Sequence, residues 1–203
     1  MFERLRLHPD RPQARLIRHA AEYMRQGLAA VVPTESTYSL MALPDAFEAI
    51  AGIRRLRQLD KQHWWSLVCL DLSQAAHYVC MDNDAHRVLK RCLPGPYTFI
   101  LPANSRFPKR VFGKRHDVGI RMPQHAVCRA LLQELNEPLL ATTLAFPDEA
   151  DAAVDPDEFI PRLKGSNILM LDASWGGVVP TTVIDLCGDN PKLMRQGMGE
   201  WPA

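Results

Sequence analysis

The stretch "PQARLIRHAAEYMRQGLAAVV" (residues 12–32) decides the fold class. Residues 12–26 predict an amphipathic helix that begins near Pro12, because apolar side chains recur on one helical face. These side chains are Leu16, Ile17, Ala20, Ala21 and Met24. Gly27 is the expected C-terminal cap, and the apolar run 28–32, which ends in β-branched residues, predicts a buried strand. A helix followed at once by a buried strand is typical of an α/β domain.

The same alternation continues along the chain. Further helices are predicted near 45–57, 83–92, 125–135 and 156–163, and strands over 66–70, 97–102, 117–123, 138–144, 167–172, 181–186 and 192–196. The stretches 147–157 and 174–180 are expected to be loops. We therefore expect one domain over residues 1–203, with a core of residues 10–200, in which helices pack on a mixed sheet.

Composition supports a single globular domain. The chain has 203 residues, of which 47% are apolar and 23% charged, close to the average for soluble proteins. No apolar run approaches the roughly 20 residues that span a bilayer, and no signal peptide is recognisable. We expect a cytoplasmic protein that does not enter membranes.

Standard catalytic and metal-binding signatures are absent. No P-loop, G-x-G-x-x-G or G-x-S-x-G motif occurs. The five cysteines form no C-x-x-C pair and are expected to be small buried apolar residues, and structural or surface roles are expected for the seven histidines. Any chemistry would depend on positioning and electrostatics.

Charge is unevenly distributed although the net charge is only +1. Basic residues concentrate in 54–63, 86–92 and 106–116, whereas 146–158 is acidic. If the basic stretches converge on one face, they would hold phosphate; the alternative is a solvated surface.

A polar cluster follows the strand predicted at 28–32. The segment "PTESTYSL" (residues 33–40) is expected to expose its polar side chains at a strand end, where α/β proteins bind ligands: Thr34, Glu35, Ser36, Thr37 and Tyr38. The alternative is a turn in which Ser and Thr side chains cap the neighbouring backbone.

Other polar residues lie at predicted strand ends. They are Arg121, Thr142, Thr143, Thr181, Thr182 and Arg195. Arginine binds carboxylate or phosphate in a bidentate manner, and hydroxyls add further hydrogen bonds. Together these residues predict a cleft for phosphate and carboxylate groups.

The ordered series "PTESTYSL", "SLVCL", "PGPYTFILP", "VGIRMP", "LLATT", "VPTTVIDL" and "RQG" resembles the YrdC/YciO family, and its early and late segments are most similar to the YciO branch. The resemblance implies an open, twisted YrdC-like sheet with a concave basic face. It also implies the threonylcarbamoyl-AMP synthase reaction, in which ATP with Mg²⁺, L-threonine and bicarbonate give threonylcarbamoyl-AMP and pyrophosphate. This reaction begins the synthesis of threonylcarbamoyladenosine in tRNA, and some members have been linked to double-stranded RNA.

The resemblance also implies roles for individual residues. Substrate-binding roles fall on Thr34, Tyr38, Arg121 and Thr181, and nucleotide-binding roles on Arg57, Ser66, Thr143 and Arg195. No protein nucleophile and no protein-held metal are implied.

Several positions depart from the family pattern. Leu59 stands where a second cation is usual, Ser39 replaces a glycine, the S-A-N segment is Thr143-Leu144-Ala145, and Trp64 and Trp65 add bulk before Ser66. Loss of one cation removes charge-assisted hydrogen bonds of about 1.5–3 kcal/mol each. Two alternatives to the synthase therefore remain: a nucleotide- or double-stranded-RNA-binding protein of the same fold, and a small-metabolite-binding domain.

Overall fold

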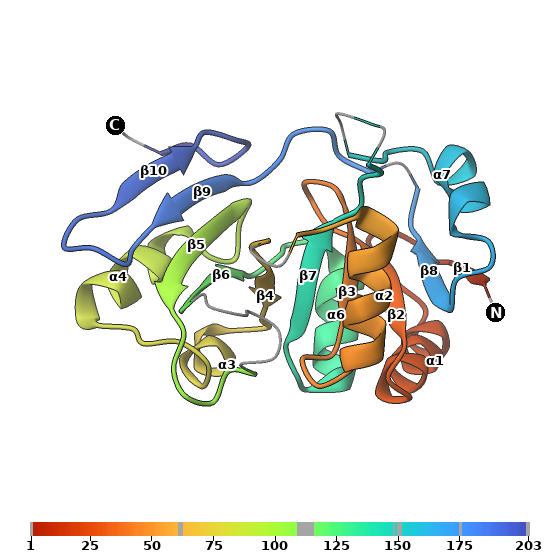
Figure 1. The fold of residues 1–203 in the computed structure, drawn as a ribbon, viewed down its shortest axis with the longest axis horizontal. Helices are drawn as coiled ribbons and strands as arrows, with labels where there is room; N and C mark the ends of the chain where they lie inside the picture. Colours follow the sequence, from red (N-terminus) through yellow and green to blue (C-terminus); the bar gives the residue numbers. More distant parts are fainter. Residues whose placement is uncertain are drawn as a thin grey trace.

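The computed structural model describes residues 2–60, 63–108, 116–147, 149, 152–174 and 176–201. Its centre is one ten-stranded sheet with the order β1-β8-β2-β3-β7-β4-β6-β5-β9-β10 (Figure 1). The strands are β1 (Glu3–Arg6), β2 (Ala29–Pro33), β3 (Tyr38–Ala42), β4 (Ser66–Val68), β5 (Tyr97–Pro102), β6 (Asp117–Arg121), β7 (Leu139–Thr143), β8 (Ile168–Asp172), β9 (Thr182–Asp185) and β10 (Lys192–Arg195).

The sheet is mixed, as the sequence predicts. β8 is parallel to both β1 and β2, β4 is parallel to β6, and β5 is parallel to β9. The remaining neighbours are antiparallel. Parallel pairs need crossover connections, which the helices supply.

Helices cover both faces of the sheet. They are α1 (Ala14–Arg25), α2 (Phe47–Arg57), α3 (Leu72–Ala76), α4 (Asn83–Cys92), α6 (Ala126–Leu135) and α7 (Pro156–Leu163). α1 packs against α6, whereas α2 packs on β2 and β3; Figure 1 shows α2 in front of these strands and α6 behind. In that view the front of β4 and β6 has no described helix over it.

The periodic segments fold for the reasons that their sequences suggest. In α1 the apolar face of Ile17, Ala20, Ala21 and Met24 is buried, and Gly27 after the helix has a φ of +81°, which glycine adopts without steric cost. α4 begins at Asp82, whose carboxylate accepts a hydrogen bond from the Ala85 N–H at 2.8 Å.

The largest difference from the sequence prediction is at residues 34–42. The polar cluster was expected to be exposed, and that expectation is wrong for four of its five residues: Thr34, Ser36, Thr37 and Tyr38 are at most 3% exposed. The reason is that β3, which was not predicted, folds back on β2 and pairs with β7 on its other side. The cluster is the turn of a central hairpin.

Smaller differences concern β1, α3 and the cysteines. β1 and α3 were not predicted, because "ERLR" and "LSQAA" are too short and too polar to show periodicity. Cys69 and Cys128 are buried as expected, but Cys80 and Cys187 are exposed. No helix within the described ranges is long and apolar enough to cross a bilayer.

Candidate ligand-binding cleft

A cleft of about 300 Å³ lies over the middle of the sheet, at the low end of the range for small-ligand sites. Of the eight predicted site residues, six line it: Arg57, Ser66, Arg121, Thr143, Thr181 and Arg195. They come from α2, β4, β6, β7, the residue before β9, and β10. The structure thus brings together residues that are far apart in the sequence.

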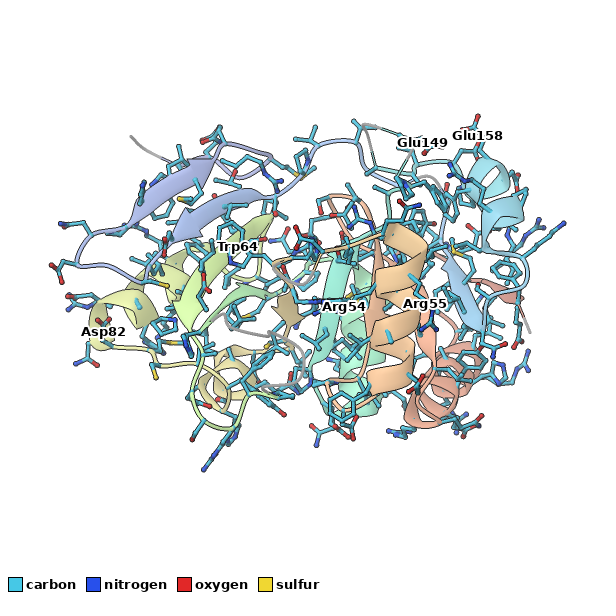
Figure 2. All side chains as sticks on the ribbon, in the orientation of Figure 1. Arg54, Arg55, Trp64, Asp82, Glu149 and Glu158 are labelled. Atoms are coloured by element: carbon cyan, nitrogen blue, oxygen red, sulfur yellow. The ribbon has the colours of Figure 1, made fainter. Side chains whose placement is uncertain are left out.

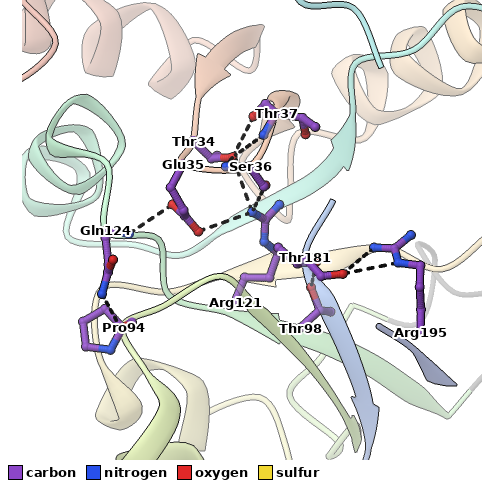
Figure 3. A network of polar contacts seen from close by, with 10 residues as sticks. All are labelled: Thr34, Glu35, Ser36, Thr37, Pro94, Thr98, Arg121, Gln124, Thr181 and Arg195. Carbon is purple, nitrogen blue, oxygen red and sulfur yellow. Dashed lines mark hydrogen bonds and ion pairs between the residues drawn. The ribbon is translucent and has the colours of Figure 1, made fainter. Parts of the chain in front are cut away.

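The turn between β2 and β3 holds Arg121. The Thr34 hydroxyl donates to the Thr37 carbonyl at 2.6 Å and accepts from the Thr37 N–H at 3.2 Å, so the turn is capped by its own side chain. Arg121 Nη2 then donates to Ser36 Oγ at 3.0 Å and to Thr34 Oγ1 at 3.4 Å (Figure 3). The cluster therefore acts as a capped turn and as a support for the arginine.

Glu35 is the carboxylate beside Arg121. Its Oε1 lies 3.8 Å from Arg121 Nη2, and its Oε2 accepts a hydrogen bond from the Gln124 N–H at 3.1 Å (Figure 3). Arg121 is only 6% exposed, and this burial lowers its pKa although the Glu35 carboxylate acts in the opposite direction. The guanidinium is thus fixed and poorly hydrated, which strengthens its attraction for a bound anion.

Thr181 and Arg195 form the side of the cleft near β9 and β10. The hydroxyls of Thr98 and Thr181 are hydrogen-bonded at 2.8 Å, and Arg195 donates from Nη2 to the Thr181 carbonyl at 2.9 Å. Burial, with a smaller contribution from the positive charge of Arg121, lowers the pKa of Arg195. Thr98, which the sequence did not single out, lines the cleft with them.

Arg57 ends α2 and reaches across to the end of β7. Its Nε donates to the Ala145 carbonyl at 3.1 Å, and its Nη1 donates to Thr142 Oγ1 at 2.6 Å. Burial lowers its pKa. His63 Nε2 also contacts Thr142 Oγ1, at 2.9 Å, so a histidine that the sequence analysis assigned no binding role lies in the cleft. No spacing signal identified it, because its partner is distant in sequence.

The departures from the family pattern occupy defined places. Leu59, at the position of the missing cation, packs against the hydrophobic core. Trp65 is fully buried and Trp64 is 44% exposed, and both line the cleft. Trp64 Nε1 donates to Asp117 Oδ2 at 3.1 Å. Figure 2 shows Trp64 near β5, and it shows Arg54 on the edge of α2 that faces the middle of the sheet.

Tyr38 does not line the cleft. Its hydroxyl donates to the Ser174 carbonyl at 2.5 Å and accepts from the Ala173 N–H at 3.3 Å, and its ring meets Phe159 edge-on. These contacts hold the strap, which we define as residues 173–174 and 176–181, the described connection from β8 to β9 (Figure 1). Burial raises the pKa of Tyr38 to about 12. A role of Tyr38 in substrate binding stays a prediction.

The cleft is positively charged. Three arginines line it, and no Asp or Glu is among its described lining residues. Of the basic stretches, 54–63 contributes Arg57 and His63 to the cleft. The stretch 86–92 is part of α4 and lines no part of the cleft, and residues 61–62 and 109–115 lie outside the described part of the chain. Only the first basic stretch is therefore seen at the cleft. The arrangement suits a ligand with phosphate or carboxylate groups.

Comparison with known proteins gives consistent results. Residues 22–197 match the Sua5/YciO/YrdC family, described as "Telomere recombination". The chain is 40% identical to the uncharacterised protein YciO of Escherichia coli K12 over 195 residues, which is 96% of this chain and 95% of that protein. It is 32% identical to the threonylcarbamoyl-AMP synthase of Chromobacterium violaceum over 136 residues, 66% of this chain and 70% of that protein.

Solved structures agree in fold. The crystal structure of E. coli YciO superposes with a TM-score of 0.93 and covers 98% of both chains. The structure of P. abyssi Sua5 complexed with L-threonine superposes with a TM-score of 0.86 at 24% identity, over 97% of this chain and 57% of that one. At that identity the likeness concerns the fold alone.

Proposed function

The chain belongs to the Sua5/YciO/YrdC family, and on this premise we propose that its cleft converts L-threonine, bicarbonate and ATP into threonylcarbamoyl-AMP and pyrophosphate. The observation that carries the proposal is the convergence of Arg57, Arg121 and Arg195 on one cleft that has no described acidic lining. A reaction between a carboxylated amino acid and a triphosphate needs such an excess of cations.

Different residues of the cleft suit different parts of the ligands. Arg121 and Thr181, with Thr34 supporting the arginine, would hold the threonine carboxylate and hydroxyl. The relative P. abyssi Sua5 has been solved in complex with L-threonine, which supports threonine as the amino acid. Arg57 and Arg195, with the hydroxyls of Ser66 and Thr143, would hold the nucleotide.

The chemistry requires no protein nucleophile. The threonine amine attacks the carbon of bicarbonate, and loss of one water molecule gives a carbamate. A carbamate oxygen then attacks the α-phosphate of ATP, from which pyrophosphate leaves. The protein would contribute alignment of the two reactants and stabilisation of the developing negative charge. Among the described residues no group of three or more His, Cys, Asp or Glu side chains is arranged to hold a metal ion. In this proposal Mg²⁺ enters with ATP as part of the substrate.

The product would serve the modification of tRNA, a cytoplasmic process, so a cytoplasmic location belongs to the same proposal. The relative from C. violaceum, a threonylcarbamoyl-AMP synthase, supports this role. The alternative of a binding protein without the reaction is separated from the enzyme by the experiment below.

The test is pyrophosphate release by the purified protein with ATP and Mg²⁺, with and without L-threonine and bicarbonate. We expect release only when both are present, and a fall of roughly tenfold to a hundredfold in Arg195→Gln and in Arg57→Gln, the range for one lost charge-assisted hydrogen bond. Arg87→Gln, on the exposed face of α4, is the matched control and is expected to release pyrophosphate normally. The proposal would be refuted if pyrophosphate release did not depend on threonine, or if both cleft variants released pyrophosphate as fast as the wild-type protein.

A further inference from the structure

The hydroxyl of Thr142 lies between two nitrogen-bearing side chains in the cleft. Arg57 Nη1 approaches its Oγ1 at 2.6 Å and His63 Nε2 approaches it at 2.9 Å. A guanidinium can only donate, whereas an imidazole nitrogen donates or accepts according to its protonation. The direction of the contact between His63 and Thr142 therefore depends on the tautomer and on the charge of the histidine.

The two states of His63 have different consequences for Thr142. When Nε2 of a neutral His63 accepts, the single hydroxyl proton of Thr142 is used in that contact. When His63 is protonated, Nε2–H donates to Thr142 Oγ1, and the hydroxyl proton is free to turn toward the cleft, which both residues line. Protonation thus adds a positive charge and, when the neutral ring carries its proton on Nδ1, also releases a hydrogen-bond donor toward a ligand.

Among the residues that the structure describes, several cations lie near His63. Arg57 shares Thr142 with it; Arg54 lies over the ring of Trp65, which His63 meets edge-on; and Arg121 and Arg195 line the same cleft. The acidic residues on neighbouring elements are Asp60, whose carbonyl accepts from the His63 N–H at 3.4 Å, and Asp117, which accepts from Trp64. Nearby cations favour neutral imidazole, and an anion placed among them favours imidazolium.

We propose that His63 is a proton-linked anion contact of the cleft, which takes up a proton when a phosphate oxygen of the ligand lies beside Arg57 and Thr142. It would supply part of the positive charge that is missing at Leu59, whose side chain packs against the hydrophobic core. The inference rests on the proposed function only in assuming a phosphate-bearing ligand. His63 would make ligand binding depend on pH, because imidazole is the side chain that ordinarily titrates near neutrality.

The test is ATP binding to the full chain by calorimetry between about pH 5.5 and 8.5, with His63→Gln as the variant. Glutamine places an amide nitrogen near the position of Nε2 but cannot take up a proton, and residue 63 is only half-buried. The ratio of the two dissociation constants at each pH cancels the titration of ATP itself. We expect this ratio, the dissociation constant of His63→Gln divided by that of the wild-type protein, to grow by roughly tenfold toward low pH, the equivalent of one pKa unit of coupling. His86→Gln, on exposed α4, is the matched control and should leave the profile unchanged.

A second readout is the pH titration of the His63 ring, monitored by NMR. Its midpoint is expected to rise when ATP is added; an unchanged midpoint, or a ratio that is flat with pH, would overturn the inference. His63-dependent ATP binding without pyrophosphate release would support this inference and remove the proposed function. Pyrophosphate release with a flat ratio would do the reverse, and failure of ATP to bind at any pH would overturn both.

Discussion

Tyr38 offers a sharp test of how the strap is held. Its hydroxyl donates to the Ser174 carbonyl at 2.5 Å and accepts from the Ala173 N–H at 3.3 Å. Tyr38→Phe keeps the ring, with its edge-on contact to Phe159, but leaves both backbone groups without this partner. A partly buried polar group that loses its hydrogen bond costs about 1–2 kcal/mol. For a chain of 203 residues this corresponds to a fall in Tm of roughly 2–8 °C.

The same hydroxyl predicts a dependence on high pH. Burial raises the pKa of Tyr38 to about 12 from an ordinary value of 10.0. Because the folded pKa is the higher one, the stabilisation is fully present below pH 10 and is lost as the pH rises through 12. The wild-type protein should therefore lose more stability between pH 10 and 12 than Tyr38→Phe does.

The assay is urea unfolding followed by circular dichroism at neutral pH and again between pH 10 and 12. Tyr97→Phe is the control, since its hydroxyl donates to the Glu200 carbonyl at 2.9 Å in an exposed position and should matter by less than about 0.5 kcal/mol. If Tyr38→Phe is as stable as the wild-type protein, or loses stability as steeply above pH 10, the strap is not held in this way.

Further substitutions test the packing against the turn between β2 and β3 and the pairing of Arg121 with Glu35. A Cβ at Gly177 would lie 2.1 Å from the Ser36 carbonyl oxygen, so Gly177→Ala should lower the free energy of unfolding by about 1–3 kcal/mol. Gly188→Ala is the control and should leave it unchanged, because no atom lies within 4 Å of the added Cβ. Equal urea midpoints for the two variants would contradict this. Arg121→Met should cost about 1.5–3 kcal/mol because it removes charge-assisted hydrogen bonds. Adding Glu35→Gln should restore part of the loss, since it removes the partly buried carboxylate that Arg121→Met leaves without its cation. A double-mutant cycle by urea unfolding with zero coupling would show that the two groups do not interact.

The sequence predicted those parts of the fold that have strong local periodicity. α1, α4 and α6 show the helical repeat, and β2 and β5 are apolar runs of strand length. β1 could not be predicted in this way, because its sequence "ERLR" has no apolar pattern and it forms only by pairing with β8, far along the chain. Pairing over such a sequence separation leaves no local signal.

The site was predicted in part. Arg121, Thr143 and Arg195 stood out because polar residues at strand ends carry information about binding. Tyr38 was expected to be exposed but is buried, because β3, which was not predicted, carries the tyrosine into the sheet with its hydroxyl toward the strap. His63 was missed because its place in the cleft depends on its contact with Thr142, which only the folded chain brings within 2.9 Å.

The central claim is that this cleft makes threonylcarbamoyl-AMP. The most direct measurement is mass spectrometry of the products after incubation of the protein with ATP, Mg²⁺, L-threonine and ¹³C-bicarbonate. The account predicts threonylcarbamoyl-AMP that carries one ¹³C atom, formed in excess over the protein and reduced in Arg195→Gln. Absence of this product at high protein concentration, with ATP binding intact, would contradict the claim and favour a binding protein of the same fold.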